Sequence, residues 1–210
     1  MLRLPKLFTS KLSFRISLKV VSLVAALLAV ALMTMLLYSR KTVKQEAVMT
    51  AEQTLEGTME YIDGILFSVE QSAGNIYFSM CRHLDDPEMM YVYSRRLVEA
   101  NPYISGCAIA MEPYYYKDRG ELFMAYHHRS ETGLNIVRSE TFGDTPYTQQ
   151  EWYTEPMKKG KPCWMDPLED LDANNEAITT YCLPIYGAAG KRIGIMGVDV
   201  TINMLSRIIL

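Results

Sequence analysis

The longest uninterrupted apolar run of the chain is residues 20–38, VVSLVAALLAVALMTMLLY. It contains no charged residue, proline or glycine. As a helix that rises about 1.5 Å per residue, it is about long enough to cross a hydrocarbon layer of about 30 Å. The alternative is a cleaved signal peptide, whose apolar core is usually about 7–15 residues long and ends in small residues. This run is longer and ends in bulky residues, so we expect a retained transmembrane helix.

A second apolar pattern follows the span and continues to residue 84 without a proline. Apolar residues recur there every three or four positions, which is typical of one face of a helix. The stripe comprises Val48, Ala51, Leu55, Met59, Ile62, Leu66, Val69, Ala73, Ile76, Met80 and Leu84. We expect residues 39–84 to form a stalk helix that ends packed on a sheet. A coiled coil along the whole helix is the alternative. The two interpretations are compatible if the first half of the helix pairs between subunits and the second half covers a core.

The rest of the chain changes from helical to strand-like patterning. Residues 85–102 predict a second helix, because Asp85 or Asp86 can cap it, Pro87 fits its first turn and Pro102 stops it. Strand-length apolar runs bounded by turn residues follow at 105–113, 121–129, 134–141, 178–187 and 191–200. The loop GAAGK joins the last two runs as a hairpin.

Residues 142–177 interrupt this series without a clear strand or helix of their own. A connection of this length is usually either functional or disordered. This one contains both tryptophans, Trp152 and Trp164, together with Tyr147 and Tyr153. Because disordered segments are poor in aromatic residues, we expect an ordered loop that covers another part of the protein.

Together these elements predict an α+β fold, with helices on one face of an antiparallel sheet of five to six strands. The expected order is a basic N-terminus at 1–19, a transmembrane helix at 20–38, a stalk and core helix at 39–84, a compact module at 85–200 and the start of a further helix at 201–210. Because that helix begins so close to Leu210, we expect the chain to be a fragment of a longer protein.

The charge distribution separates the N-terminal segment from the rest. Eight of the 21 lysines and arginines lie in residues 1–44, which contain no Asp or Glu, so 13 basic residues face all 24 acidic ones in the remainder. Such an acidic body argues against nucleic-acid binding. Five basic residues precede the span and three follow it, which favours a cytoplasmic N-terminus. We therefore expect an inner (plasma) membrane protein with residues 45–210 outside the cytoplasm.

No motif in the sequence indicates catalysis, a cofactor or a metal centre. The chain has no nucleophile elbow, phosphate-binding loop or HExxH sequence, and no plausible pair of catalytic carboxylates. Its four cysteines, Cys81, Cys107, Cys163 and Cys182, lack CxxC spacing, so a zinc site is not expected. We interpret them as small buried residues. An oxidising compartment would also permit disulfides, and Cys163–Cys182 is then the first pair to test.

The last predicted strand, RIGIMGVDV at residues 192–200, carries a carboxylate. By alternation, Gly197 and Asp199 share one of its two faces. A glycine weakens a strand unless something must approach closely, and burying an unpartnered carboxylate is costly. We therefore expect this face to line a small cavity, with the 142–177 loop as its lid. The alternative is that Asp199 is the N-cap of the helix that follows the strand.

The candidate ligand-binding residues are aromatic or polar side chains expected near this face: Trp152, Tyr153, Asp199, Tyr181, Tyr126, Arg129 and Gln150. Arg129 could pair with an anionic group of a ligand. A surface arginine at a strand end is the simpler interpretation of that residue.

The segments NPYISGCAIAMEP, EWY and YCLPIYGAAGKRIGIMGVDVTINML, placed after a membrane span and a long helix, resemble the extracytoplasmic Cache sensor domain of bacterial transmembrane receptors. The resemblance covers about residues 40–210 and is greatest to the membrane-distal module of the double Cache type. It implies a PAS-like antiparallel sheet on the long helix, small ligands between sheet and loop, and homodimers. It also implies a second module, a second span and a cytoplasmic output, for which we favour a PPM-type serine phosphatase or a histidine kinase.

The resemblance also bears on the ligand. Family members that bind amino acids carry an arginine two residues before the Trp-Tyr pair, where it holds the ligand carboxylate. Here Gln150 occupies that position, whereas Trp152, Tyr153 and Asp199 match the pattern, with Asp199 at the place where an aspartate meets a ligand amine. The resemblance therefore implies an amine or another small metabolite rather than a free amino acid.

The expected function is extracytoplasmic sensing of a small molecule, with no enzymatic activity in residues 1–210. The alternative is a ligand-free structural or dimerisation module, or a partner-protein-binding domain, on a membrane anchor.

Overall fold

The computed structural model of the chain describes residues 11–130, 136–139, 145–170 and 176–206. By its internal contacts the chain divides into two units, Met1–Gly57 and Thr58–Leu210. The following parts of the predictions lie outside the described residues: residues 1–10 of the basic N-terminus, parts of the strand at 134–141 and of the loop at 142–177, and residues 207–210 of the last helix.

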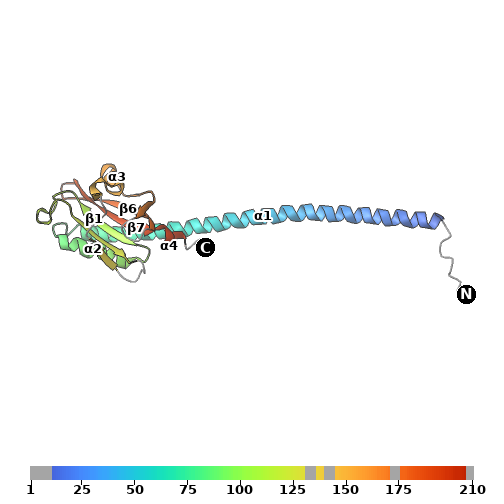
Figure 1. The fold of residues 1–210 in the computed structure, drawn as a ribbon, viewed down its shortest axis with the longest axis horizontal. Coiled ribbons are helices and arrows are strands. Elements are labelled where there is room, and N and C mark those ends of the chain that lie inside the picture. Colours follow the sequence, from blue (N-terminus) through green and yellow to red (C-terminus); the bar gives the residue numbers. More distant parts are fainter. Residues whose placement is uncertain (1–10, 131–135, 140–144, 171–175, 207–210) are drawn as a thin grey trace. The chain divides into compact units, whose positions relative to one another are not determined.

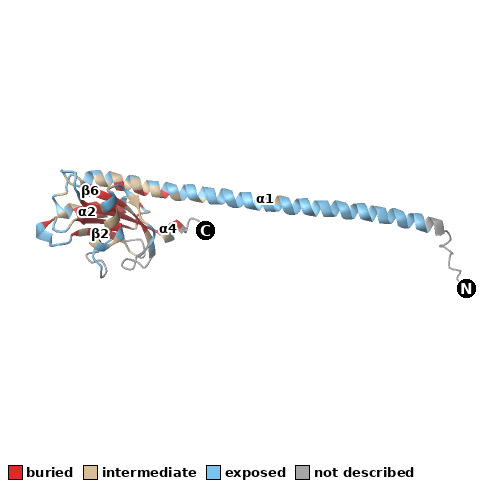
Figure 2. Ribbon diagram, turned by 90° about the horizontal axis from the view of Figure 1, so that it is seen from above, coloured by how far each residue is buried: buried red, intermediate tan, exposed pale blue. Residues whose placement is uncertain are grey.

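The first helix, α1 (Lys11–Met80), passes through both units (Figure 1). In the first unit its large apolar side chains are exposed (Figure 2). By length and composition it is a helix that could cross a membrane. The segments expected as span and stalk belong to this one continuous helix, which ends four residues before the predicted end.

The second helix, α2 (Pro87–Ala100), begins and ends as its sequence predicts. The Asp86 side chain accepts a hydrogen bond of 2.9 Å from the backbone N–H of Glu88, and Pro87 occupies the first turn. Asn101 follows the last turn in an extended conformation, and its side-chain amide donates to Ser68 and Ser72 of α1. Asn101 therefore fixes the C-terminal end of α2 against α1 within the domain.

One antiparallel sheet carries the domain, with the strand order β3-β2-β1-β7-β6-β4 and with β5 also paired to β6. The strands are β1 (Gly106–Met111), β2 (Met124–Arg129), β3 (Ile136–Ser139), β4 (Cys163–Trp164), β5 (Leu168–Asp170), β6 (Glu176–Tyr186) and β7 (Arg192–Thr201). Five of them are the predicted strands, and the sequence of helices and strands confirms the α+β class. A short helix, α4 (Ile202–Ser206), follows β7, as predicted.

The interpretation of residues 142–177 as a loop without regular structure was wrong. This segment contains a 3-10 turn, η2 (Tyr147–Gln149), a helix, α3 (Glu151–Lys159), and the two short strands β4 and β5. Pro156 lies inside α3, and Gly160 ends the helix in the left-handed conformation. The two short strands extend the predicted sheet at its β6 edge.

The two faces of the sheet are covered by different helices, with α3 on one side and α2 on the other (Figure 1). The α2 side holds the larger core, to which the second part of α1 contributes Ile65, Val69, Ala73 and Met80. Alternate residues of the central strands point into this core, among them Cys107, Ile109, Met111, Met196, Val198 and Val200. The intervening residues therefore face α3, and that second face holds the candidate site.

Gly194 of β7 has no room for a side chain. A Cβ built there would lie 2.4 Å from the backbone oxygen of Ala110 and 3.1 Å from Cα of Met111. Backbone cannot yield as a flexible side chain can, so the close approach of β1 and β7 requires glycine here.

We predict that Gly194→Ala lowers the free energy of unfolding of the domain by about 2 kcal/mol through overpacking. Gly74→Ala is the matched control, because a Cβ at this helical glycine meets no atom within 4 Å and alanine favours the helix by about 0.5–1 kcal/mol. Urea denaturation followed by tryptophan fluorescence measures both, since both tryptophans lie in the domain. Equal stabilities of the two variants would contradict the prediction.

Candidate functional site

On the α3-facing side of the sheet, the residues around Asp199 on the two central strands, β1 and β7, are unusually small. One row contains His128, Gly106, Asp199 and Thr180, on β2, β1, β7 and β6. The next row contains Tyr126, Ala108, Gly197, Cys182 and Cys163. The two central strands thus carry only Gly106, Ala108 and Gly197 around the carboxylate, so backbone rather than side chains forms the floor.

The Asp199 side chain is buried on this face and is only 8% exposed. The Thr180 hydroxyl donates to its Oδ1 at 2.7 Å, and the Tyr126 hydroxyl donates to its Oδ2 at 3.3 Å. Burial of a carboxylate requires such donors. Asp199 lies inside β7, three residues before α4 begins at Ile202, so it is not the N-cap of that helix.

Gly106 makes the contact between Tyr126 and Asp199 possible. A Cβ built on Gly106 would lie 2.7 Å from the Tyr126 hydroxyl and 2.8 Å from Asp199 Oδ2. Any side chain there would push the two groups apart. The Tyr126 ring also stacks on His128, with centroids 5.4 Å apart and planes 19° from parallel.

Trp152 of α3 covers the neighbouring glycine of β7. A Cβ built on Gly197 would lie 3.4 Å from Trp152 Cε3 and 3.3 Å from the methyl group of Thr180. The missing side chain at Gly197 is therefore replaced by the indole ring. Trp152 itself is 8% exposed, so the ring fills the space above the glycine in this structure.

Gln150 holds the Trp152 ring in place. The indole Nε1 donates to Gln150 Oε1 at 2.6 Å, and Gln150 Nε2 donates to the backbone oxygen of Thr145 at 2.9 Å. Both ends of the amide are used in these bonds. Gln150 therefore positions the aromatic cover instead of presenting a positive charge to the sheet.

The N-terminal turn of α3 is anchored to β6 by a thiol. Pro156 has no N–H, so it cannot donate to the backbone oxygen of Trp152 four residues earlier, as the helix pattern requires. Cys182 Sγ donates to that oxygen at 3.3 Å instead. Burial raises the pKa of the Cys182 thiol, and the nearby charge of Asp199 acts in the same direction, so the group remains a neutral donor.

Tyr153 also packs on the α3 face, in a group of aromatic residues with Trp152 and Tyr147, but it lies toward Met111 and away from Asp199. Its ring lies 5.2 Å from that of Tyr147, whose hydroxyl donates to the Met111 backbone oxygen at 2.7 Å. Tyr153 Oη is buried and has no hydrogen-bond partner among the residues that the structure describes. Burial raises the pKa of the Tyr153 hydroxyl, and Tyr147 and Glu112 add to the effect. An unpaired buried hydroxyl of this kind costs free energy unless a partner arrives.

Tyr181 does not join the group around Asp199. It pairs with Val198 in the β6–β7 register and packs against the larger core on the α2 side of the sheet. Its ring lies 5.1 Å from Trp164, whose Nε1 donates to Glu70 of α1 at 2.7 Å. The sheet therefore separates Tyr181 from the predicted site.

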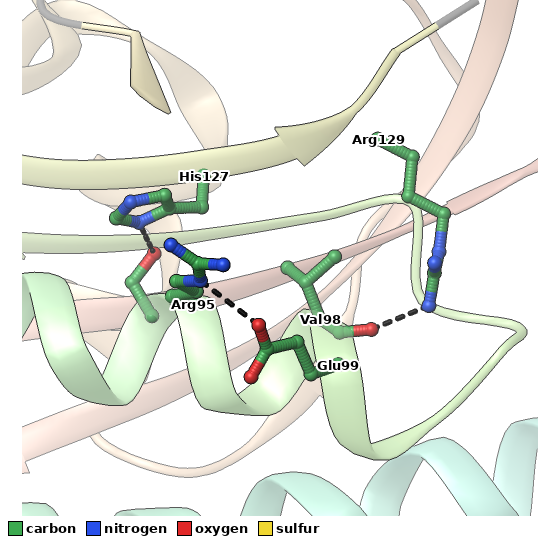
Figure 3. Close-up of polar contacts among 6 residues, drawn as sticks. Arg95, Val98, Glu99, His127 and Arg129 are labelled. Carbon is green, nitrogen blue, oxygen red and sulfur yellow. Dashed lines mark hydrogen bonds and ion pairs between the residues drawn. The ribbon is translucent and has the colours of Figure 1, made fainter. Parts of the chain in front are cut away.

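Arg129 also lies on the other face, beside the C-terminal end of α2 (Figure 3). Its guanidinium donates to the backbone oxygens of Val98, Asn101 and Ile104. It thus gives a partner to the Val98 carbonyl in the last turn of α2, whose helical partner four residues later would be Pro102, which has no N–H. His127, on the same face, contacts the Ser94 hydroxyl at 3.1 Å. The structure gives Arg129 a structural role and not the pairing with a ligand that we considered.

Sequence reasoning missed Thr180, Gly106 and His128, all of which lie around Asp199. Their common signal is cross-strand position, which requires the register of the sheet. Among the described side chains, no group of three or more His, Cys, Asp or Glu residues could hold a metal ion.

Comparisons with known proteins agree on the class of this domain. Residues 90–207 match the sequence model of the family described as methyl-accepting chemotaxis protein-like, first PDC sensor domain. The methyl-accepting chemotaxis protein TlpQ of Pseudomonas aeruginosa is 26% identical over an alignment of 133 residues, and the match covers 53% of this chain and 19% of that protein. The chain thus spans about a fifth of the length of this relative.

Solved structures show the same fold. The periplasmic sensory domain of the Campylobacter jejuni chemoreceptor Tlp1 has a TM-score of 0.60 at 12% identity, over 72% of this chain and 59% of that one. The ligand-binding domain of Mlp24, solved with asparagine, has a TM-score of 0.55 at 15% identity, over 78% of this chain and 60% of that one.

The family match covers more than half of the chain, and the PDC fold is the Cache-type sensor fold that the sequence resembles. Together with the apolar helix, this match implies a membrane-anchored receptor with an extracellular small-molecule sensor. The chain therefore belongs to the family of first PDC sensor domains of methyl-accepting chemotaxis protein-like receptors.

Proposed function

We propose that the domain senses a small organic amine, which binds between the sheet and α3 with its ammonium group on Asp199. The observation that carries this proposal is the buried Asp199 carboxylate above a floor of Gly106, Ala108 and Gly197. Thr180 and Tyr126 supply neutral donors to this carboxylate. An ammonium group would add the opposite charge to the site.

The aromatic groups around the carboxylate suit the same ligand. Trp152 and Tyr126 flank the small-residue floor from α3 and β2. Aromatic faces attract cations that lie within about 6 Å of the ring centre. Because Trp152 occupies the space above Gly197, we propose that ligand entry requires the ring and α3 to move outward. The Tyr153 hydroxyl, which has no hydrogen-bond partner among the described residues, would then be able to bond to a polar group of the ligand.

Gln150 supports an amine over a free amino acid. The relative Mlp24 was solved with asparagine, a free amino acid, and the resemblance places a carboxylate-binding arginine at the position of Gln150. Here the glutamine amide is bonded to Trp152 and Thr145. A ligand carboxylate would therefore meet no positively charged side chain at position 150.

The position of Asp199 suggests how binding is transmitted. Gly197 and Asp199 face α3, whereas Met196, Val198 and Val200 of the same strand face the core that contains α1. A displacement of β7 by the ligand would therefore change packing against α1. Signalling of this kind requires the ligand to favour one of two arrangements.

We place this sensor on an inner-membrane receptor, with residues 20–38 as the span and 45–210 outside the cytoplasm. The chemotaxis relatives support a signalling output in the rest of the receptor. That output would be of the chemotaxis type or would be an enzyme such as a histidine kinase or a PPM-type phosphatase. Residues 1–210 would carry the sensory input only.

A homodimer through α1 fits the exposed side chains of the domain. In the part of α1 within the second unit, Met59, Phe67 and Phe78 are 58%, 62% and 73% exposed, and their spacing directs them to one side of the helix. Large apolar side chains exposed together often mark an interaction surface. This observation also favours the alternative function, a dimerisation module, which can coexist with sensing.

We predict that Asp199→Asn weakens binding of small primary amines at least about 30-fold, because the isosteric amide removes the charge of a buried ion pair. Isothermal titration calorimetry with a panel of such amines measures the effect. Tyr181→Phe is the matched control on the opposite face and should change affinity less than twofold. Equal affinities of Asp199→Asn and the unaltered chain would contradict the assignment, as would a panel in which no amine binds.

We predict that Gln150→Arg raises the affinity for free L-amino acids about 10- to 100-fold, through a charge-assisted hydrogen bond to the ligand carboxylate. Gln150→Met, which loses the same bonds to Trp152 and Thr145 without adding charge, is the control. Titration of each variant with amino acids and with the corresponding decarboxylated amines separates the two effects. If the arginine variant gains nothing for amino acids, position 150 does not face the ligand.

We predict that Phe67→Glu shifts the chain toward the monomer, because it places a charge on the exposed apolar face of α1. Cross-linking in membranes followed by gel electrophoresis measures the dimer fraction. Asp63→Glu, an exposed conservative change on the same helix, should leave that fraction unaltered. An undiminished dimer in Phe67→Glu would contradict pairing through this face.

A further inference from the structure

Cys163 and Cys182 lie directly opposite each other in the β4–β6 pair. The register continues beyond them, since Met165 donates its N–H to the Thr180 backbone oxygen at 2.9 Å. Side chains of directly opposed residues in an antiparallel pair point to the same face. The two thiols therefore stand side by side on the α3 face of the sheet.

The geometry of such a pair suits a covalent link. Directly opposed residues have Cα atoms about 4.5–5.5 Å apart, within the range of about 4.4–6.8 Å found for disulfides. Their Cβ atoms, about 4.5–5.5 Å apart, would have to approach by up to about 1 Å. Strand β4 is only two residues long and stands at the end of the main strand order, so it can make this adjustment.

We propose that Cys163 and Cys182 form a reversible disulfide that ties the segment after α3 to β6. The location outside the cytoplasm rests on the proposed function, and it is there that disulfides persist. The other two cysteines differ in position: Cys107 is completely buried in the core on the opposite face, and Cys81 follows the end of α1.

The reaction is a two-step exchange with a small-molecule or protein disulfide as the oxidant. Partly exposed Cys163 attacks the oxidant first, which forms a mixed disulfide and releases one thiol. Cys182 then displaces the second thiol, and the new S–S bond closes. Two protein thiols are oxidised, and the oxidant disulfide is reduced to two thiols. Because burial raises the pKa of Cys182, we expect the second step to be the slow one.

Oxidation also reaches the candidate site. In the reduced form Cys182 donates its S–H to the Trp152 backbone oxygen, which Pro156 leaves without its helical partner. The disulfide removes that donor while it closes a loop between β4 and β6. The redox state of this pair thus acts on the N-terminal turn of α3, which carries Trp152.

The test uses the full chain in membranes or detergent, treated with oxidised glutathione. A mass-tagged maleimide, added after denaturation without reductant, counts the free thiols. We expect two adducts, at Cys81 and Cys107, and four after reduction. Cys163→Ser should give three adducts without reductant, and Cys81→Ser should give one. Peptide mapping under non-reducing conditions should recover the linked fragments of Cys163 and Cys182.

Loop closure should also raise the melting temperature of the oxidised chain by about 5–10 °C, and reductant should abolish the increase. Cys163→Ser should show no difference between the two conditions. Four adducts in the oxidised unaltered chain would overturn the proposal, as would a linkage that involves Cys81 or Cys107. Thiol counting requires no ligand, so its result tests the disulfide whether or not the domain binds an amine.

Discussion

Asp199 is a carboxylate near the end of β7, a strand that also builds the main hydrophobic core. Such a group must be given hydrogen-bond donors and space. Thr180 and Tyr126 are the donors, and Gly106 leaves room for the contact. Gly197, beside it, leaves room for the Trp152 ring. The placement of these residues and of α3 follows from accommodating one acid on this face.

The opposite face of the same sheet holds the domain together. Alternate residues of β1 and β7 pack against α1 and α2, and Arg129 donates to the Val98 carbonyl at the end of α2 and to the backbone oxygens of the segment that follows it. This division lets the sheet keep its core while the α3 face remains available for recognition. It also places the α3-facing and α1-facing residues of β7 next to each other in the chain, and in the proposed function this gives ligand binding a short path to α1.

The hydrophobic pattern was sufficient for α1, α2 and the five main strands, because each has a clear period and clear end signals. The register was not predictable in the same way. The hairpin begins with Tyr186 opposite Arg192, and uninterrupted pairing would put Tyr181 opposite Gly197. An irregularity at Ile185 and Tyr186 shifts the pairing by one residue, so that Cys182 takes that place. A shift of one residue moves each side chain to the other face, so Tyr181 lies opposite Val198 and on the other face from Asp199.

Helix α3 was missed for a different reason. It has nine residues, and Pro156 lies where proline normally ends a helix. The lost backbone bond is replaced by the Cys182 thiol, a tertiary contact that local sequence does not reveal. The position of Arg129 was, in contrast, accessible from alternation alone, because Tyr126 and Arg129 on one strand cannot share a face. Asp199 was identified from alternation along the last strand and Trp152 from the aromatic content of residues 142–177, and the family pattern added Gln150.

The central claim is that the α3 face around Asp199 is the recognition surface of this sensor. A crystal structure of the domain with a bound primary amine tests it most directly. We expect the ammonium nitrogen within about 3 Å of an Asp199 carboxylate oxygen, with Trp152 displaced from Gly197 and packed against the ligand. An amine bound on the α1 and α2 side of the sheet, with Trp152 still seated on Gly197, would contradict the account.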